Sequence, residues 1–178
     1  MKIIEGEKLF YREITEEDTD LVLRWRNSDF VRSNFIYQPL ITREEHLIWL
    51  NTKVNTGQVI QFIILEKAVG RAIGSVYLRD IDYVAKKAEY GIFIGEESAC
   101  GKGYGTEAAG TMISFAFKEL ELQKLTLRVL AKNVRAIKSY EKAGFLVKES
   151  RMEEIVINGR CQNLIFMEII AQEEKGKK

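Results

Sequence analysis

Histidine, cysteine and proline are scarce in this chain of 178 residues. It contains one histidine, His46, two cysteines, Cys100 and Cys161, and one proline, Pro39. A single histidine excludes a metal centre built from several histidines. Two cysteines without a nearby Cys/His cluster form neither a zinc-ligand set nor a disulfide framework. The composition therefore predicts a chain without a bound metal that works in a reducing compartment.

An excess of charge and a long apolar run are missing as well. Lysine and arginine number 27 and aspartate and glutamate 26, for a formal net charge of +1. This balance does not predict a nucleic-acid partner, and no run reaches the length of a membrane span. Residues 1–6 lack the apolar stretch of a signal peptide, so we expect a cytoplasmic protein with no membrane partner.

Length and hydrophobic content fit one core. With 46% hydrophobic residues, 178 residues suffice for a single domain, which we expect over residues 1–172, followed by a flexible tail over 173–178. Both a monomer and a homodimer stay open.

The hydrophobic pattern predicts a mixed α/β domain. Strands are expected at 9–14, 59–65, 72–78, 86–94 and 125–130, and helices at 15–27, 42–54, 106–120 and 133–143. A closing hairpin, 145–157 and 161–170, flanks Asn158-Gly159. The helix at 106–120 joins two strands that we expect to be parallel, and Gly91 predicts an irregularity in its strand.

The most informative segment is glycine-rich. Gly101, Gly103 and Gly105 alternate just before the helix expected from Thr106. Glycines let the main chain approach a ligand closely, and the first turn of a helix offers unpaired N–H groups to an anion. The segment therefore predicts a site for a phosphorylated cofactor.

The segment also fits three other interpretations in part. Gly103, Gly105 and Ala108 match the spacing of a dinucleotide-binding loop, but the next strand carries Arg128 and no carboxylate for a ribose. A P-loop needs Ser or Thr directly after Lys102. An ordinary strand-to-helix turn needs no ligand at all.

Two spaced motifs give the segment a more specific meaning. These are Glu89-Tyr90-Gly91 leading to the glycine loop, and Asn133 followed by Ser139-Tyr140-Glu141-Lys142-Ala143-Gly144-Phe145. Together they resemble the GNAT superfamily of acetyl-CoA-dependent N-acetyltransferases, and within it the branch of ribosomal-protein and spermidine acetyltransferases. Cys100 departs from the pattern, because the family often has Gln or Arg there.

The resemblance implies a GNAT fold, with a mixed central sheet flanked by helices, and roles for particular residues. Main-chain groups of Gly101, Lys102, Gly103, Tyr104, Gly105 and Thr106 would hold the pyrophosphate of acetyl-CoA. The strand ending at Phe93 and Ile94 would splay from the strand at Leu125 to admit the pantetheine arm. Asn133 and Tyr140 would also contact the coenzyme.

The resemblance implies catalytic roles as well. Tyr140 would protonate the leaving thiolate, since an ordinary tyrosine, with a pKa of about 10, is protonated near neutrality. Asn133 is grouped with it in the predicted catalytic site. Glu89 is the candidate base for the amine, directly or through water, although solvent alone could suffice for an amine that is already partly neutral.

The acceptor amine is predicted from the N-terminal helices. The segments Arg24-Trp25-Arg26-Asn27 and Glu45 to Leu50 are similar to acetyltransferases that modify a UDP-linked 4-amino sugar on the pseudaminic acid route. Arg26, Asn27, His46 and Trp49 are therefore candidate substrate-binding residues, although core packing would also explain them. The α-amino group of a ribosomal or other protein, a polyamine and an antibiotic are alternative acceptors. A non-catalytic acyl-CoA sensor is an alternative of another class.

Overall fold

The computed structural model describes residues 2–172, apart from the side chains of residues 149–152. The predicted tail at 173–178 lies outside the described residues. No helix within residues 2–172 has the length and apolar character needed to cross a membrane.

All described strands join one eight-stranded sheet, in the order β1-β2-β3-β4-β5-β6-β8-β7. The strands are β1 Ile3–Glu5, β2 Leu9–Glu13, β3 Ile60–Glu66, β4 Arg71–Asp82, β5 Lys87–Ile94, β6 Lys124–Leu130, β7 Leu146–Ile157 and β8 Arg160–Ile170. Every neighbouring pair is antiparallel except β5 and β6, which are parallel. The expected parallel pair across the helix after the glycine loop is confirmed.

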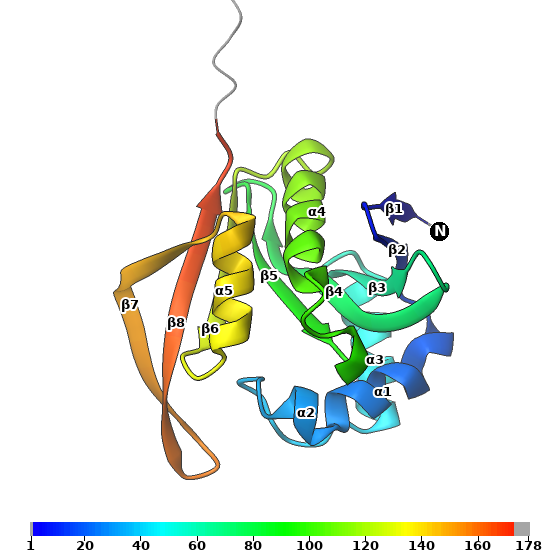
Figure 1. Ribbon diagram of the computed structural model, residues 1–178, viewed down its shortest axis with the longest axis horizontal. Coiled ribbons are helices and arrows are strands. Elements are labelled where there is room, and N and C mark those ends of the chain that lie inside the picture. Colours follow the sequence, from blue (N-terminus) through cyan, green and yellow to red (C-terminus); the bar gives the residue numbers. More distant parts are fainter. Residues whose placement is uncertain (1, 173–178) are drawn as a thin grey trace, which may run out of the picture.

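Helices cover both faces of the sheet (Figure 1). The α-helices are α1 Thr19–Asn27, α2 Asp29–Arg32, α3 Arg43–Trp49, α4 Tyr104–Lys118 and α5 Val134–Ala143, and the short helical turns are η1 Glu16–Asp18, η2 Leu50–Val54 and η3 Glu97–Ala99. α4 and α5 lie side by side on one face, whereas α1, α2 and α3 pack on the other.

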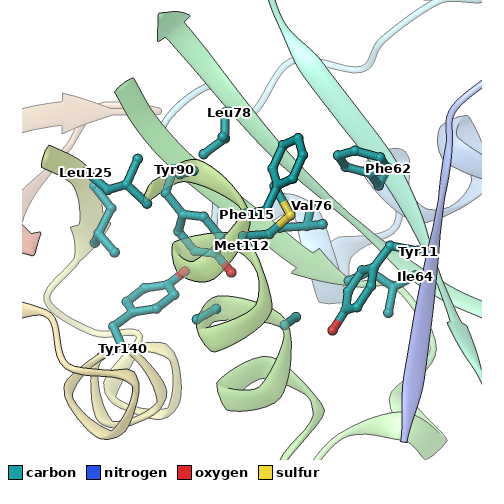
Figure 2. Packing of buried hydrophobic residues seen from close by; sticks show 14 of the residues in the cluster. Tyr11, Phe62, Ile64, Val76, Leu78, Tyr90, Met112, Phe115, Leu125 and Tyr140 are labelled. Carbon is teal, nitrogen blue, oxygen red and sulfur yellow. The ribbon is translucent and has the colours of Figure 1, made fainter. Parts of the chain in front are cut away.

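Strand alternation builds a separate apolar cluster on each face. Along β3, Phe62 and Ile64 point toward α4, while Ile63 and Leu65 pack with α1. Successive side chains of a strand face opposite sides, so a strand buried on both faces is apolar over successive positions, as in the run from Phe62 to Leu65. Figure 2 shows the cluster between the sheet and α4, with Tyr90 beside Tyr140 of α5.

Local signals in the sequence account for most element ends. Thr42 and Glu45 form the expected capping box at α3, and Gly144 ends α5 in the left-handed conformation. Asn158 and Gly159 both have positive φ, as a two-residue hairpin turn requires. The short elements β1 and α2 were not predicted.

The predicted irregularity at Gly91 was wrong. Gly91 pairs in register with Tyr77, and the bulge of this strand pair lies between Arg79 and Asp82. Glycine is needed for another reason: a Cβ at position 91 would lie 2.2 Å from the Tyr77 ring. The glycine thus lets a tyrosine of β4 lie across β5.

Gly74→Ala tests how tightly β4 and β5 are joined. A Cβ at Gly74 would lie 2.2 Å from the carbonyl oxygen of Phe93, a main-chain atom that no side-chain rotation can move away. We expect the free energy of unfolding to fall by about 3 kcal/mol, measured by urea denaturation. The control is Gly110→Ala in α4, where a Cβ meets nothing within 4 Å; it should raise stability by about 0.5–1 kcal/mol. An unchanged urea midpoint for Gly74→Ala would contradict this account.

Candidate active site

The site begins where β5 and β6 part. The two strands are paired only at Lys87, Ala88 and Glu89 of β5, opposite Lys124, Leu125 and Thr126 of β6. Beyond Glu89 the edge of β5 that faces β6 has no strand partner. Main-chain groups there are free to bind an extended ligand in the manner of an added strand. The predicted splay of these strands is therefore present.

A glycine loop lies at the end of this opening. Gly101 and Gly103 have φ of +77° and +82°, and Gly103 is the N-cap of α4. These left-handed positions turn the loop back on itself and leave the first turn of α4 facing a groove of about 370 Å³. Unpaired N–H groups and the positive end of the helix dipole make this turn suited to an anion.

Helix α5 forms the other wall of the groove. Thr106 of α4 and Ser139 of α5 share a hydrogen bond of 2.9 Å between their hydroxyls, which holds the two helices together. Asn133 caps α5, since its side-chain oxygen accepts from the Ala136 N–H. Asn133, Ser139 and Tyr140 all line the groove.

Most predicted coenzyme-binding residues border this groove. They are Phe93, Ile94, Gly101, Gly103, Tyr104, Gly105, Thr106, Asn133 and Tyr140. Lys102 is the exception, because its ammonium pairs with the buried carboxylate of Glu66 at 3.3 Å, away from the groove. The side chain of Lys102 therefore does not face the groove, and only its main chain remains a candidate coenzyme contact. Its side chain ties the loop to β3.

A second cleft, of about 570 Å³, lies against the α1 and α3 side of the sheet. The cleft and the groove share the lining residues Asn34, Ile92, Phe93, Asn133 and Tyr140. The two hollows therefore meet at Tyr140. A long ligand in the groove and a second molecule in the cleft would come together at this point.

Tyr140 is packed by other aromatic rings at the junction. Its ring lies edge-on to Tyr90, with centroids 6.0 Å apart, and 6.1 Å from Phe145. Burial, together with the neighbouring Tyr77, raises the pKa of Tyr140 above its usual value. Its hydroxyl is therefore protonated at neutral pH, as a general acid must be.

Glu89 borders the cleft, but it is not free. Its Oε1 accepts hydrogen bonds from Arg79 at 2.5 Å and from Arg128 at 3.1 Å, and Arg128 also donates to Oε2 at 3.2 Å. Two guanidinium groups thus occupy the lone pairs that a base would use. The hypothesis that Glu89 takes the proton of the amine requires one of these arginines to move.

Arg26 is the cleft's least compensated charge. Its guanidinium stacks on the Phe35 ring, 3.4 Å from the centroid, and its Nη1 is buried without a hydrogen-bond partner in the described structure. Burial lowers the pKa of Arg26, although arginine stays charged at neutral pH. An unpaired buried donor of this kind fits an acceptor group on a ligand.

His46 and Trp49, both on α3, also border the cleft. His46 Nδ1 is 3.1 Å from the Thr19 hydroxyl, and its buried Nε2 has no partner within residues 2–172. Burial lowers the pKa of His46, so the ring is neutral at pH 7. Trp49 donates its indole N–H to Gln61, which leaves the ring face for contact.

Asn27 was also predicted to bind substrate, but its side chain makes structural hydrogen bonds instead. Its side chain donates to the Ile41 carbonyl and accepts from the Ile41 N–H, both at 2.8 Å. It does not border the cleft. Asn27 instead closes the loop between α2 and α3, which includes the cleft residues Phe35 and Tyr37.

Several residues of the cleft were missed in the sequence. Tyr77, Arg79 and Arg128 come from strands, and Asn34 and Phe35 come from the loop after α2. Glycine in a strand marks a close approach by another group, so Gly91, the register partner of Tyr77, is the sequence feature that could have indicated Tyr77. No sequence pattern indicated the other four residues.

Known proteins share both this fold and its sequence pattern. Residues 8–146 match the family described as acetyltransferase (GNAT) domain. Spermidine N(1)-acetyltransferase of Vibrio cholerae is 28% identical over 163 residues, 92% of this chain and 93% of the relative. The putative ribosomal N-acetyltransferase YdaF of Bacillus subtilis is 31% identical over 109 residues, 61% of this chain and 59% of the relative.

A solved structure agrees with these relatives. The crystal structure of the Vibrio cholerae spermidine N-acetyltransferase in complex with CoA and spermine has a TM-score of 0.83 at 26% identity, over 92% of this chain and 95% of that one. The chain belongs to the GNAT family of acetyltransferases. It is an acetyl-CoA-dependent N-acetyltransferase, and its groove and glycine loop fit that coenzyme.

Gly103→Ala tests the loop as the coenzyme site. Alanine in the left-handed conformation costs about 1–2 kcal/mol, so the loop should turn away from its present path. We expect the Kd for CoA, measured by calorimetry, to rise about tenfold. Lys102→Ala is the matched control and should change the Kd by less than about threefold, since its ammonium pairs with Glu66. The opposite order of effects would contradict the assignment.

Proposed function

We propose that this enzyme acetylates the primary amine of a nucleotide-linked amino sugar, and that the cleft beside α1 and α3 holds this acceptor. The observation that supports it is the buried, unpartnered Nη1 of Arg26. A phosphate of a nucleotide would satisfy this guanidinium with charge-assisted hydrogen bonds. The resemblance of the segments around Arg26 and His46 to UDP-4-amino-sugar acetyltransferases agrees with this choice.

The rest of the cleft suits a sugar nucleotide as well. Trp49, Tyr37 and Tyr77 offer aromatic faces for a base or a sugar ring. The neutral His46, with its buried and unpartnered Nε2, offers a hydrogen bond to a polar group of the acceptor.

A polyamine is the second candidate, because the Vibrio cholerae relative, similar over nearly the whole chain, is a spermidine acetyltransferase. The charges of the cleft oppose it. Three arginines, Arg26, Arg79 and Arg128, line it against two glutamates, and Glu89 is already bound by two of those arginines. A polycation would meet repulsion there, whereas an anionic acceptor would not.

In the proposed reaction the chain positions the two reactants and moves one proton. Bound acetyl-CoA supplies the acetyl group as a thioester, and its sulfur leaves as a thiolate. Main-chain N–H groups at Gly103 to Thr106 hold the pyrophosphate, and the free edge of β5 holds the extended arm. Tyr140 gives its hydroxyl proton to the sulfur. Glu89 holds the side chains of Arg79 and Arg128 in place. Water takes the proton of the amine.

Arg26→Ala tests the acceptor. With a UDP-linked 4-amino sugar, kcat/KM should fall about 10–100-fold, the value of one or two charged hydrogen bonds. With the same amino sugar lacking the nucleotide it should change less than about threefold. Arg24→Ala is the control, since Arg24 pairs with Glu96 and does not line the cleft.

The native enzyme separates the candidates in the same assay. Thiol release from acetyl-CoA is followed with the UDP-amino sugar, with spermidine and with a peptide bearing a free α-amino group. A kcat/KM for spermidine or for the peptide above that for the sugar nucleotide would overturn the proposed acceptor.

Tyr140→Phe tests the general acid. The ring still packs against Tyr90 and Phe145, so the Kd for CoA should stay the same, while kcat falls about 100-fold or more. Because burial raises the pKa of Tyr140, the native enzyme should keep its activity as the pH rises to about 10. A falling limb centred below pH 9 that disappears in Tyr140→Phe would contradict the raised pKa, and full kcat in Tyr140→Phe would contradict the role.

A further inference from the structure

The hydroxyl of Tyr90 forms no hydrogen bond with the described residues of the folded chain. The side chain is 2% exposed, and its oxygen has no hydrogen-bond partner within the described residues. A buried hydroxyl without a partner costs about 1–3 kcal/mol, so such groups are uncommon. Phenylalanine at this position would place the same ring without that cost. We therefore expect the Tyr90 hydroxyl to form a hydrogen bond during the reaction.

Tyr140 is a polar neighbour of Tyr90 that takes part in the proposed reaction. The Tyr90 ring stands nearly perpendicular to the Tyr140 ring, at 89° and 6.0 Å between centroids, and packs on Phe145 at 5.7 Å. Figure 2 shows both phenol oxygens turned toward the space beside α4. Both residues also border the cleft in which the acceptor is proposed to bind.

Proton transfer from Tyr140 to the sulfur is energetically unfavourable unless the resulting phenolate is stabilised. An ordinary tyrosine, with a pKa of about 10, is a weaker acid than a thiol, with about 8.5. Burial makes the phenolate still less favourable. Tyr140 Oη has no hydrogen bond within residues 2–172 to stabilise the negative charge. A hydrogen-bond donor that reaches this oxygen as the phenolate forms would lower the cost by stabilising the negative charge.

We infer that Tyr90 is a positioning residue for this proton transfer, whose hydroxyl donates a hydrogen bond to Tyr140 Oη as the phenolate forms. The inference rests on the proposed role of Tyr140. As the amine nitrogen bonds to the acetyl carbon, the carbon–sulfur bond breaks and its electron pair passes to sulfur. The proton of Tyr140 Oη moves to sulfur, and the amine loses its own proton to water. Tyr140 then recovers a proton from water.

Tyr90→Phe removes only the oxygen. We expect kcat for acceptor-dependent thiol release to fall about tenfold, while both KM values and the Kd for CoA stay within about twofold. The melting temperature should stay the same or rise, because a buried unpaired hydroxyl is lost. In the Tyr140→Phe background the same change should alter kcat less than about twofold, since no phenolate forms there.

Two further variants make the result specific. Tyr11→Phe is the matched control: Tyr11 is fully buried in the same apolar cluster, but its hydroxyl contacts Thr111. It should leave kcat unchanged. Tyr90→Met fills the space with a flexible apolar chain and should show the same tenfold loss as Tyr90→Phe.

Each other outcome has a definite meaning. Full kcat in Tyr90→Phe beside an impaired Tyr140→Phe enzyme overturns the inference and leaves the general acid in place. A tenfold loss that persists in the Tyr140→Phe background also overturns it, because the effect then comes from packing. If Tyr140→Phe itself has full activity, the proposed acid fails, and the inference fails with it.

Discussion

The short pairing of two parallel strands is the constraint on which this molecule's chemistry depends. β5 and β6 are joined at three residue pairs and then separate. Complete pairing would close the sheet at this point and cover the free main-chain groups of β5. The opening also lets a residue on one face of the sheet reach the other. Tyr140, from the α4 and α5 face, borders both the groove and the opposite cleft through it.

The two hollows differ in what they offer a ligand. The groove offers main-chain geometry at Gly101 and Gly103 and the start of α4, which suit an anion. The cleft offers side chains: a stacked arginine, a neutral histidine and a glutamate held between two arginines. Charge in the cleft is therefore set by pairs of residues, and Arg26 remains the cation without a carboxylate partner among its described contacts.

Local chemistry made most of the fold predictable. Capping at Thr42 and Gly144, the turn at Asn158 and Gly159, and the apolar stripe of α4 each depend on a few neighbouring residues. The coenzyme groove was predictable for the same reason, since its loop and helix start are contiguous in the chain. Gly91 was misjudged because its requirement comes from Tyr77 on the next strand.

Side-chain partners distant in sequence were not predictable. Glu89 meets Arg79 and Arg128 only because three strands lie in a particular register, and Lys102 meets Glu66 across 36 positions. Asn27 similarly serves a loop whose path no local pattern reveals. The candidate substrate-binding residues that border the proposed acceptor cleft were therefore predicted on α1 and α3 but not on the strands.

The two faces of the sheet separate the residues that border the groove from most of those that border the cleft. Residues that shape the groove come mainly from the segment 92–142, whereas α1, α3 and the loop before α3 come from residues 19–49 and shape much of the cleft. Among residues 19–49, Phe30, Val31 and Asn34 border the groove, whereas α1 and α3 do not. Under the proposed assignment, substitutions in α1 and α3 therefore change the accepted amine and leave the coenzyme groove intact, so that the acceptor can vary while the donor stays constant.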